Sequence, residues 1–163
     1  TMLLITSEKD DFKFKFFVFN NKYEQFIFIK NDSNQKILFF KKHNKKINPI
    51  LISYLVSKER AQIDYLIIPT IDEKNLNYLI EKIRIKNIYV LDRNSIVSAQ
   101  INQKLTNKEV RVEYIGDSDF NIGNLFFYTR LNQINVKEKN NEFEIFPVNI
   151  SEIYNQPKEI FLK

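Results

Sequence analysis

The sequence predicts an α/β domain in which an antiparallel meander is joined to a helix-flanked mixed sheet. Two observations lead to this fold class. Residues 12–40 contain three apolar runs separated by polar breaks, and after residue 46 short apolar runs alternate with stretches of helical periodicity. The chain has 163 residues without an internal repeat or low-complexity tract. We therefore expect a single domain over residues 1–163, either complete or a fragment of a larger protein.

The first part of the chain has the alternation of half-buried strands. Phe and Lys alternate at the start of a predicted strand over residues 12–19, and strands over 26–30 and 36–40 follow, with a turn at 31–34. We expect each strand to have one packed face and one solvent face. The alternative is that the aromatic stripe of residues 12–40 forms an exposed platform on which nucleic-acid bases stack.

The second part of the chain has the pattern of strands connected by helices. Apolar spacing predicts the following elements in order: a helix over 50–57, a buried strand over 65–68, a helix over 72–84, a buried strand over 87–91, a helix over 94–105 capped by Asn94 or Ser95, a strand over 110–115, turns at 116–119 and 121–124, and strands over 125–129, 142–148 and 159–162.

Three residue counts exclude several kinds of site within this chain. Two glycines cannot supply a Walker A loop or a dinucleotide fingerprint. The absence of cysteine excludes disulfides, thiolate zinc sites and iron–sulfur clusters, and a single histidine, His43, excludes a histidine cluster. We therefore expect no cofactor.

The longest uncharged apolar run, residues 50–56, is too short to cross a bilayer, and no signal peptide is evident, so we expect no transmembrane segment.

The net charge of +5 comes mainly from lysine. Four lysines are concentrated within six residues and are the candidate nucleic-acid contacts: Lys41, Lys42, Lys45 and Lys46. The alternative is a solvated loop in a protein whose Lys, Asn, Ile and Phe content reflects an A/T-rich genome. We expect His43, inside this cluster, to be a surface residue.

Several carboxylates have both a structural and a functional interpretation. Asp72 and Glu73 begin a predicted helix, where negative charge complements the helix dipole, and this is the interpretation we favour. Their alternative role, together with Asp117 and Asp119, is to hold Mg²⁺ in a nuclease that uses carboxylates alone. Asp117 and Asp119 could also bind a cation with Asp32 or Asp92, but aspartate is common in turns, and this is the interpretation we favour. Ser95 lacks a histidine base, so we expect it to serve as a helix cap.

Four segments together resemble the metallo-β-lactamase-like domain, most closely the version in ComEC-type DNA-uptake channels. Residues 17–29 have the strand–loop–strand pattern of the family's opening "LDVGQGDAILI", and residues 35–40 are similar to "GKTILIDGG". Residues 50–68 are similar to "VLPYLKSKGIKKIDYLILSH", and residues 120–124 to "I.IGN". The resemblance covers nearly the whole chain and implies half of a metallo-β-lactamase-like fold.

The resemblance also implies that the metal site has been lost. The family binds metal with an H-x-H-x-D-H loop, but here Pro69 and Ile71 replace the first two histidines and Lys74 the last, while Glu73 falls near the aspartate. These four residues form a relic loop. We therefore expect no metal, no catalytic residue and no enzymatic activity.

The function implied by the resemblance is that of a non-catalytic accessory domain in DNA uptake. Its partners would be single- or double-stranded DNA and other envelope or channel proteins, in an extracytoplasmic or membrane-associated parent protein. If the resemblance does not hold, we expect the chain to be cytoplasmic. The alternative function is a protein-interaction or assembly domain of a cell-envelope complex without a nucleic-acid role.

Overall fold

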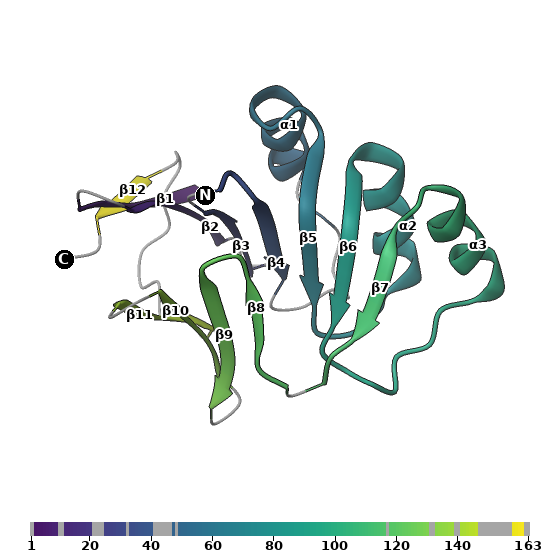
Figure 1. The fold of residues 1–163 in the computed structure, drawn as a ribbon. Helices are drawn as coiled ribbons and strands as arrows, with labels where there is room; N and C mark the ends of the chain where they lie inside the picture. The colour runs from purple at the N-terminus through teal and green to yellow at the C-terminus, as the bar shows by residue number, and fades with distance from the viewer. Residues whose placement is uncertain are drawn as a thin grey trace.

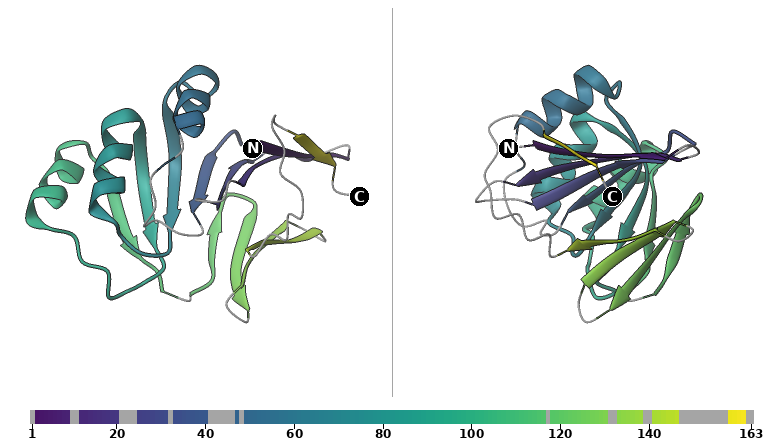
Figure 2. Two further views of the ribbon diagram at one scale, coloured as in Figure 1. Left: turned by 180° about the vertical axis from the view of Figure 1, so that it is seen from behind. Right: turned by 90° about the vertical axis from the view of Figure 1, so that its left-hand side faces the viewer.

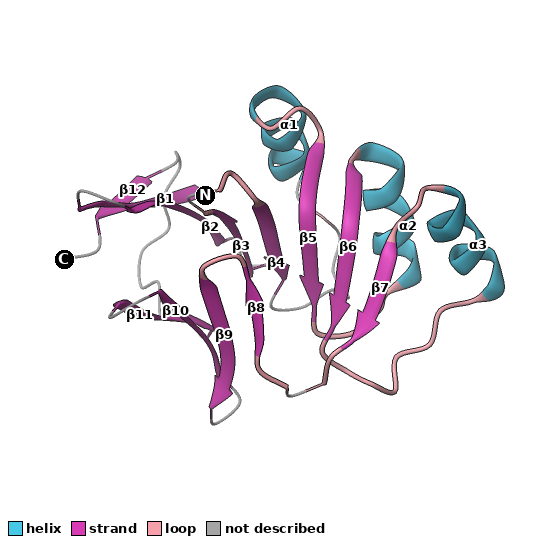
Figure 3. Ribbon diagram, viewed as in Figure 1, coloured by secondary structure: helices cyan, strands magenta, loops and turns pink. Residues whose placement is uncertain are grey.

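A computed structural model of the chain has mixed α/β architecture, with two sheets and three helices among the residues it describes (Figures 1 and 3). The described residues are 2–9, 12–20, 25–31, 33–40, 47, 49–116, 118–130, 133–138, 141–146 and 158–161. The larger sheet, here called the main sheet, has eight strands in the order β12-β1-β2-β3-β4-β5-β6-β7. The small sheet has four strands in the order β11-β10-β9-β8.

The predicted meander is confirmed. Its strands are β2 (Phe12–Asn20), β3 (Gln25–Lys30) and β4 (Lys36–Phe40), each antiparallel to the next, with Phe17 opposite Phe28 and Phe28 opposite Leu38. One further strand, β1 (Met2–Lys9), extends the meander and is antiparallel to β2. The last described strand of the chain, β12 (Lys158–Phe161), lies parallel to β1 at the edge of the main sheet.

The second half of the main sheet is parallel, as expected for strands connected by helices. The elements follow in order: α1 (Pro49–Lys58), β5 (Gln62–Ile68), α2 (Glu73–Lys82), β6 (Arg84–Val90), α3 (Ala99–Asn107) and β7 (Arg111–Tyr114). Strands β4 to β7 are parallel neighbours. Their carboxyl ends therefore lie at one edge of the main sheet and their amino ends at the opposite edge (Figure 1).

The small sheet is an antiparallel meander that follows β7. Its strands are β8 (Phe120–Ile122), β9 (Leu125–Arg130), β10 (Gln133–Glu138) and β11 (Asn141–Phe146). Residues 121 and 122, expected in a turn, belong to strand β8 instead. The pairing of Ile122 with Leu125 leaves only two residues for the turn of the hairpin.

The helices and the small sheet cover opposite faces of the main sheet (Figure 2). Leu38, Leu66 and Ile88 belong to one core with the apolar side chains of the helices. On the other face the Phe39 ring lies 5.5 Å from that of Phe127 in β9. A second layer therefore covers the side of the meander on which a solvent face was predicted.

The expectation of one wet face is therefore wrong for β3 and β4. Residues 26–29 and 37–40 are at most 1% exposed, on both faces of the sheet. An exposed stacking platform is excluded for these two strands by the same burial. The runs of β3 and β4 are continuously apolar, and the small sheet supplies a second layer over the face that was expected to be exposed.

Glycine is required where the small sheet meets the meander. Gly123, in the β8–β9 turn, has a φ of 58°, in the left-handed region. A Cβ atom there would lie 2.7 Å from Gln35 Oε1 and 2.9 Å from Asn31 Nδ2. These two side chains are joined by a 2.7 Å hydrogen bond, and Asn31 is buried. The β8–β9 turn therefore rests directly on the β3–β4 turn.

A buried carboxylate connects α1 to the meander. Glu59 is 5% exposed, and its Oε2 lies 3.1 Å from Lys36 Nζ and 3.5 Å from Lys30 Nζ. Tyr54 donates a 3.4 Å hydrogen bond to Oε1, and Lys36 also donates to the Glu59 carbonyl at 2.8 Å. The next two residues, Arg60 and Ala61, have φ values of 56° and 51°, which turn the chain from α1 into β5.

Within the described ranges, no helix has the length and apolar character needed to cross a membrane.

Candidate functional site

The relic loop follows β5 at the carboxyl edge of the parallel strands, where ligands gather in open α/β sheets. It is joined there to the loop that follows β6. Asp92 donates its N–H to the Pro69 carbonyl at 2.8 Å, and Ile71 donates its N–H to Ser95 Oγ at 3.2 Å. Residues that the sequence placed after two different strands thus come together at this edge.

The two acidic residues of this loop bind the backbone at helix starts. Asp72 is the N-cap of α2, and its Oδ1 accepts the N–H of Asn75 at 2.9 Å. Glu73 Oε1 accepts the N–H of Ser98, the residue that caps α3. The helix-start interpretation of Asp72 is confirmed, and the carboxylate of Glu73 additionally ties α2 to α3.

The predicted cap of the third helix is wrong. That helix begins at Ala99 and is capped by Ser98, whose Oγ accepts the N–H of Ile101. Residues 92–95 instead form a turn in which Asp92 Oδ1 accepts the N–H of Asn94 at 2.9 Å, while Ser95 Oγ lies 3.5 Å from Asp92 Oδ2. Asn94, Ser95 and Ser98 can all act as caps. Val97, the residue before the cap, packs against the core, a contact that the cap residues alone do not reveal.

The other residues of this loop are not arranged as metal ligands. Ile71 packs against the core, and Lys74 is exposed on α2. Within the described part of the chain no three His, Cys, Asp or Glu side chains are grouped to hold a metal ion. Asp119 is exposed, and Asp117, like Asp32, lies outside the described residues. The basic cluster of residues 41–46, with His43, also lies outside them.

Sequence reasoning missed a row of aromatic side chains on the face of the main sheet that carries the small sheet. Ring centroids are 5.5 Å apart between Tyr65 and Tyr89, 5.4 Å between Tyr89 and Phe120, and 4.9 Å between Phe120 and Phe127. Phe127 is buried, whereas the other three rings keep part of their surface in solvent. The row therefore runs from the buried contact between the sheets onto the surface of β6 and β5.

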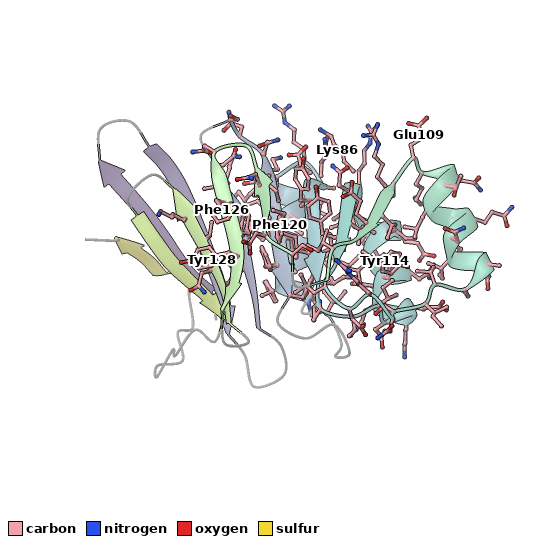
Figure 4. The ribbon with its side chains drawn as sticks, turned by 60° about the horizontal axis from the view of Figure 1, so that its bottom comes forward. Lys86, Glu109, Tyr114, Phe120, Phe126 and Tyr128 are labelled. Atoms are coloured by element: carbon pink, nitrogen blue, oxygen red, sulfur yellow. The ribbon has the colours of Figure 1, made fainter. Side chains whose placement is uncertain are left out.

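Polar side chains surround the exposed end of this row. In the parallel register Tyr65 pairs with Asn87 and Asn87 with Arg111, while Tyr89 pairs with Glu113. Residues in register share a face, so these five side chains form one surface, which we call the open face. Asn87 is partly exposed, and Arg111 and Glu113 are exposed. Figure 4 labels Phe120, the ring of the small sheet next to this surface, and Lys86.

The electrostatics of the open face are mixed. Burial raises the pKa of Tyr89 above its ordinary value, and the nearby carboxylate of Glu113 and then Tyr65 raise it further. Tyr89 is therefore a neutral hydrogen-bond donor at physiological pH. At the margin, Lys86 Nζ forms a 2.6 Å ion pair with Asp64, whose carbonyl accepts the Asn87 side-chain amide at 3.0 Å. The face offers two aromatic planes, an amide and a guanidinium, a set suited to flat polar ligands.

A single sequence signal pointed toward this site. Tyr65 begins the run 65–68 and Tyr89 lies within the run 88–91, and the other residues of both runs are aliphatic. A tyrosine in a buried strand usually keeps its hydroxyl at a polar or wet position.

Comparisons of the chain with protein-family models, with curated proteins and with solved structures find no match.

Proposed function

We propose that this chain is a non-catalytic domain that binds single-stranded DNA on the open face, as an accessory domain of DNA uptake. The observation that carries the proposal is the pair of partly exposed tyrosines, Tyr65 and Tyr89, with Asn87 and Arg111 in register beside them. Every nucleobase has a π-face, so aromatic stacking tolerates any sequence, and an arginine beside the rings contacts the phosphates.

The charge of the chain supports a polyanionic ligand. The net charge is +5, and Arg111 is exposed on the open face. Glu113 and Asp64 oppose it there, so the open face alone is not strongly basic. In the proposal the lysine cluster 41, 42, 45 and 46 supplies the further phosphate contacts. Phosphate contacts set the salt dependence of binding, and stacking supplies a part that salt affects little.

The carboxylates at the carboxyl edge support a non-catalytic role. Asp72, Glu73 and Asp92 accept backbone hydrogen bonds that hold α2, α3 and the 92–95 turn in place. Withdrawing them to bind Mg²⁺ would leave those N–H groups without acceptors. The proposed degenerate relationship to the ComEC-type metallo-β-lactamase-like domain rests on the sequence phrases and on the same relic loop, where Pro69, Ile71 and Lys74 cannot act as imidazole ligands.

The test is fluorescence anisotropy of a short labelled oligothymidine and of a duplex of equal length, from low to moderate salt. The variant Tyr65→Leu/Tyr89→Leu removes both rings and keeps apolar bulk. Stacking contributes about 1–3 kcal/mol per base, so this variant should bind oligothymidine about tenfold more weakly or worse. The matched control is Tyr114→Leu. Tyr114 is 40% exposed and is in register with Val90, on the helix side of the sheet.

Each outcome has a defined meaning. Weaker binding by the double variant together with unchanged binding by Tyr114→Leu supports the open face as the DNA site. The variant Lys41→Ala/Lys42→Ala/Lys45→Ala/Lys46→Ala should lower the slope of log affinity against log salt by about 0.7 for each phosphate that it no longer neutralises. Absence of oligothymidine binding at low salt, or equal binding by all variants, contradicts the proposal.

A second candidate function is a protein-interaction domain of a cell-envelope assembly. The observation that favours it is the position of β7 at the end of the main sheet, where its outer side has no strand partner among the described residues. Such an edge can pair with a strand from another chain. Concentration-dependent self-association in analytical ultracentrifugation, without any DNA binding, would favour this function over the first.

A further inference from the structure

A cavity of about 410 Å³ lies at the opposite edge of the main sheet from the relic loop, at the amino ends of the parallel strands. Its apolar lining comes from the end of α2, the start of β6 and the segment before β7: Ile80, Ile83, Ile85 and Val110. Three cations also line it: Lys82, Arg84 and Lys108. We call this cavity the amino-edge pocket. Its size is within the range of small-molecule sites, about 300–1,000 Å³.

The walls of the pocket are fixed by backbone hydrogen bonds. Arg84 donates its N–H to the Ala61 carbonyl at 2.7 Å, and Ile83 closes α2 by donating to Leu79 at 2.9 Å. On the other side Val110 donates to Leu105 at 2.9 Å, directly after Glu109, whose φ is 56°. The three segments that carry the cations are therefore positioned by the fold before any ligand arrives.

The charges of the pocket remain positive after internal pairing. Glu81 also lines it, but its carboxylate accepts from Asn77 at 3.1 Å and lies 3.6 Å from Lys104. The pocket cations Lys82, Arg84 and Lys108 form no salt bridge within the described part of the chain. The carboxyl ends of α2 and α3 contribute about half a negative charge each. The three cations exceed this, so an anion is favoured over a cation.

We propose that the amino-edge pocket binds a small amphiphilic anion, with a phosphate or carboxylate between Arg84 and Lys108. Its apolar chain or ring would lie against Ala61, Val110 and the aliphatic stems of the cations, because the three isoleucines are at most 3% exposed. Burial of an apolar group against this lining contributes about 25 cal/mol of binding free energy per Å² of apolar surface removed from water. The cations bind the charged end of the ligand and thereby fix its orientation. Lys82 contributes less, because its Nζ already lies 5.9 Å from the Tyr78 ring. This site is independent of the DNA-binding proposal, since the open face belongs to a different surface.

The test is isothermal titration calorimetry of the full chain with octyl phosphate, octanoate, octanol and inorganic phosphate. We expect both amphiphilic anions to bind and octanol and inorganic phosphate to bind at least about tenfold more weakly, because each lacks one half of the recognised chemistry. The variant Arg84→Gln/Lys108→Gln should weaken octyl phosphate binding by about tenfold or more. The control Lys74→Gln, at the other end of α2, should bind as the wild type does.

Three results would overturn the proposal: no binding of octyl phosphate, equal binding of octanol, or unchanged binding by Arg84→Gln/Lys108→Gln. Circular dichroism checks that the variant is folded. If it is not, Lys108→Gln alone provides the test, because Lys108 is exposed at the end of α3 and a single loss of charge there should still weaken binding several-fold. The Tyr65→Leu/Tyr89→Leu variant should keep full octyl phosphate affinity, so failure of one proposal is distinguishable from failure of the other.

Discussion

Replacing Glu59 with glutamine keeps the shape of the side chain and removes its charge. Two lysines then lose their carboxylate, and the Tyr54 hydroxyl faces an amide instead. Removing one partner of a fully buried ion pair costs about 3–5 kcal/mol, whereas an exposed pair contributes at most about 1 kcal/mol. The side chain of Glu59 is 6% exposed, but those of Lys36 and Lys30 are 17% and 29% exposed.

The lysines can therefore turn partly toward water, and Lys36 keeps its hydrogen bond to the Glu59 carbonyl. We expect Glu59→Gln to lower the free energy of unfolding by about 2–3 kcal/mol, between the two limits. The assay is urea denaturation followed by circular dichroism. The matched control is Glu81→Gln, the same substitution in an ion pair with Lys104 whose side chains are 53% and 38% exposed; it should cost less than about 1 kcal/mol. Equal effects of the two substitutions would refute the argument that burial decides the difference.

Three further predictions use the same denaturation assay. Gly123→Ala should lower the free energy of unfolding by about 2–3 kcal/mol, because it adds left-handed strain and a clash with the β3–β4 turn. Gly116→Ala should lower it less, because the strain is the same but the added Cβ meets only a movable arginine side chain. The reverse order would contradict this account of the contact between the two turns. Asp72→Ala should cost about 1 kcal/mol through loss of the α2 cap, and Asp72→Asn much less; equal losses would mean that the charge, not the cap, matters. Burial and then the charge of Glu59 hold the pKa of Tyr54 above its ordinary value near 10. The folded chain then retains this proton more tightly than the unfolded chain. The contribution of this proton to the free energy of unfolding is complete below pH 10 and declines as the pH rises above 10. The free energy of unfolding should therefore fall less steeply above pH 10 in Tyr54→Phe than in the wild type.

Local patterns predicted the elements whose burial is set by their own sequence. The runs at 26–30, 36–40 and 65–68 are short, mostly apolar and close to turn residues, a combination typical of buried strands. The apolar stripe before residue 84 defines one face of a helix. The start of α3 was misplaced because three residues near it can each act as a cap, and contacts distant in sequence favour Ser98: its N–H binds Glu73, and Val97 packs against the core.

The second sheet depended on contacts that no local pattern encodes. The Asn and Gly residues of 121–124 are typical of a turn, yet two of these positions form β8 through pairing with β9. The aromatic row has the same origin, since Tyr65 and Tyr89 come from different strands and are brought together by the β5–β6 register. The sequence shows the chemistry of each side chain, but it does not show the strand register, which decides which side chains lie next to one another on a surface.

The parallel pairing of β1 with β12 has a consequence for synthesis. Strand β1 leaves the ribosome well before residues 158–161, the segment that pairs with its outer edge. Until residues 158–161 have been made, the outer backbone N–H and C=O groups of β1 can pair with an unpaired strand of another chain. A product that stops before residue 158 keeps that edge exposed permanently. Interrupted translation would therefore yield chains prone to associate with one another, whereas chains that include residues 158–161 cover the outer edge of β1 themselves.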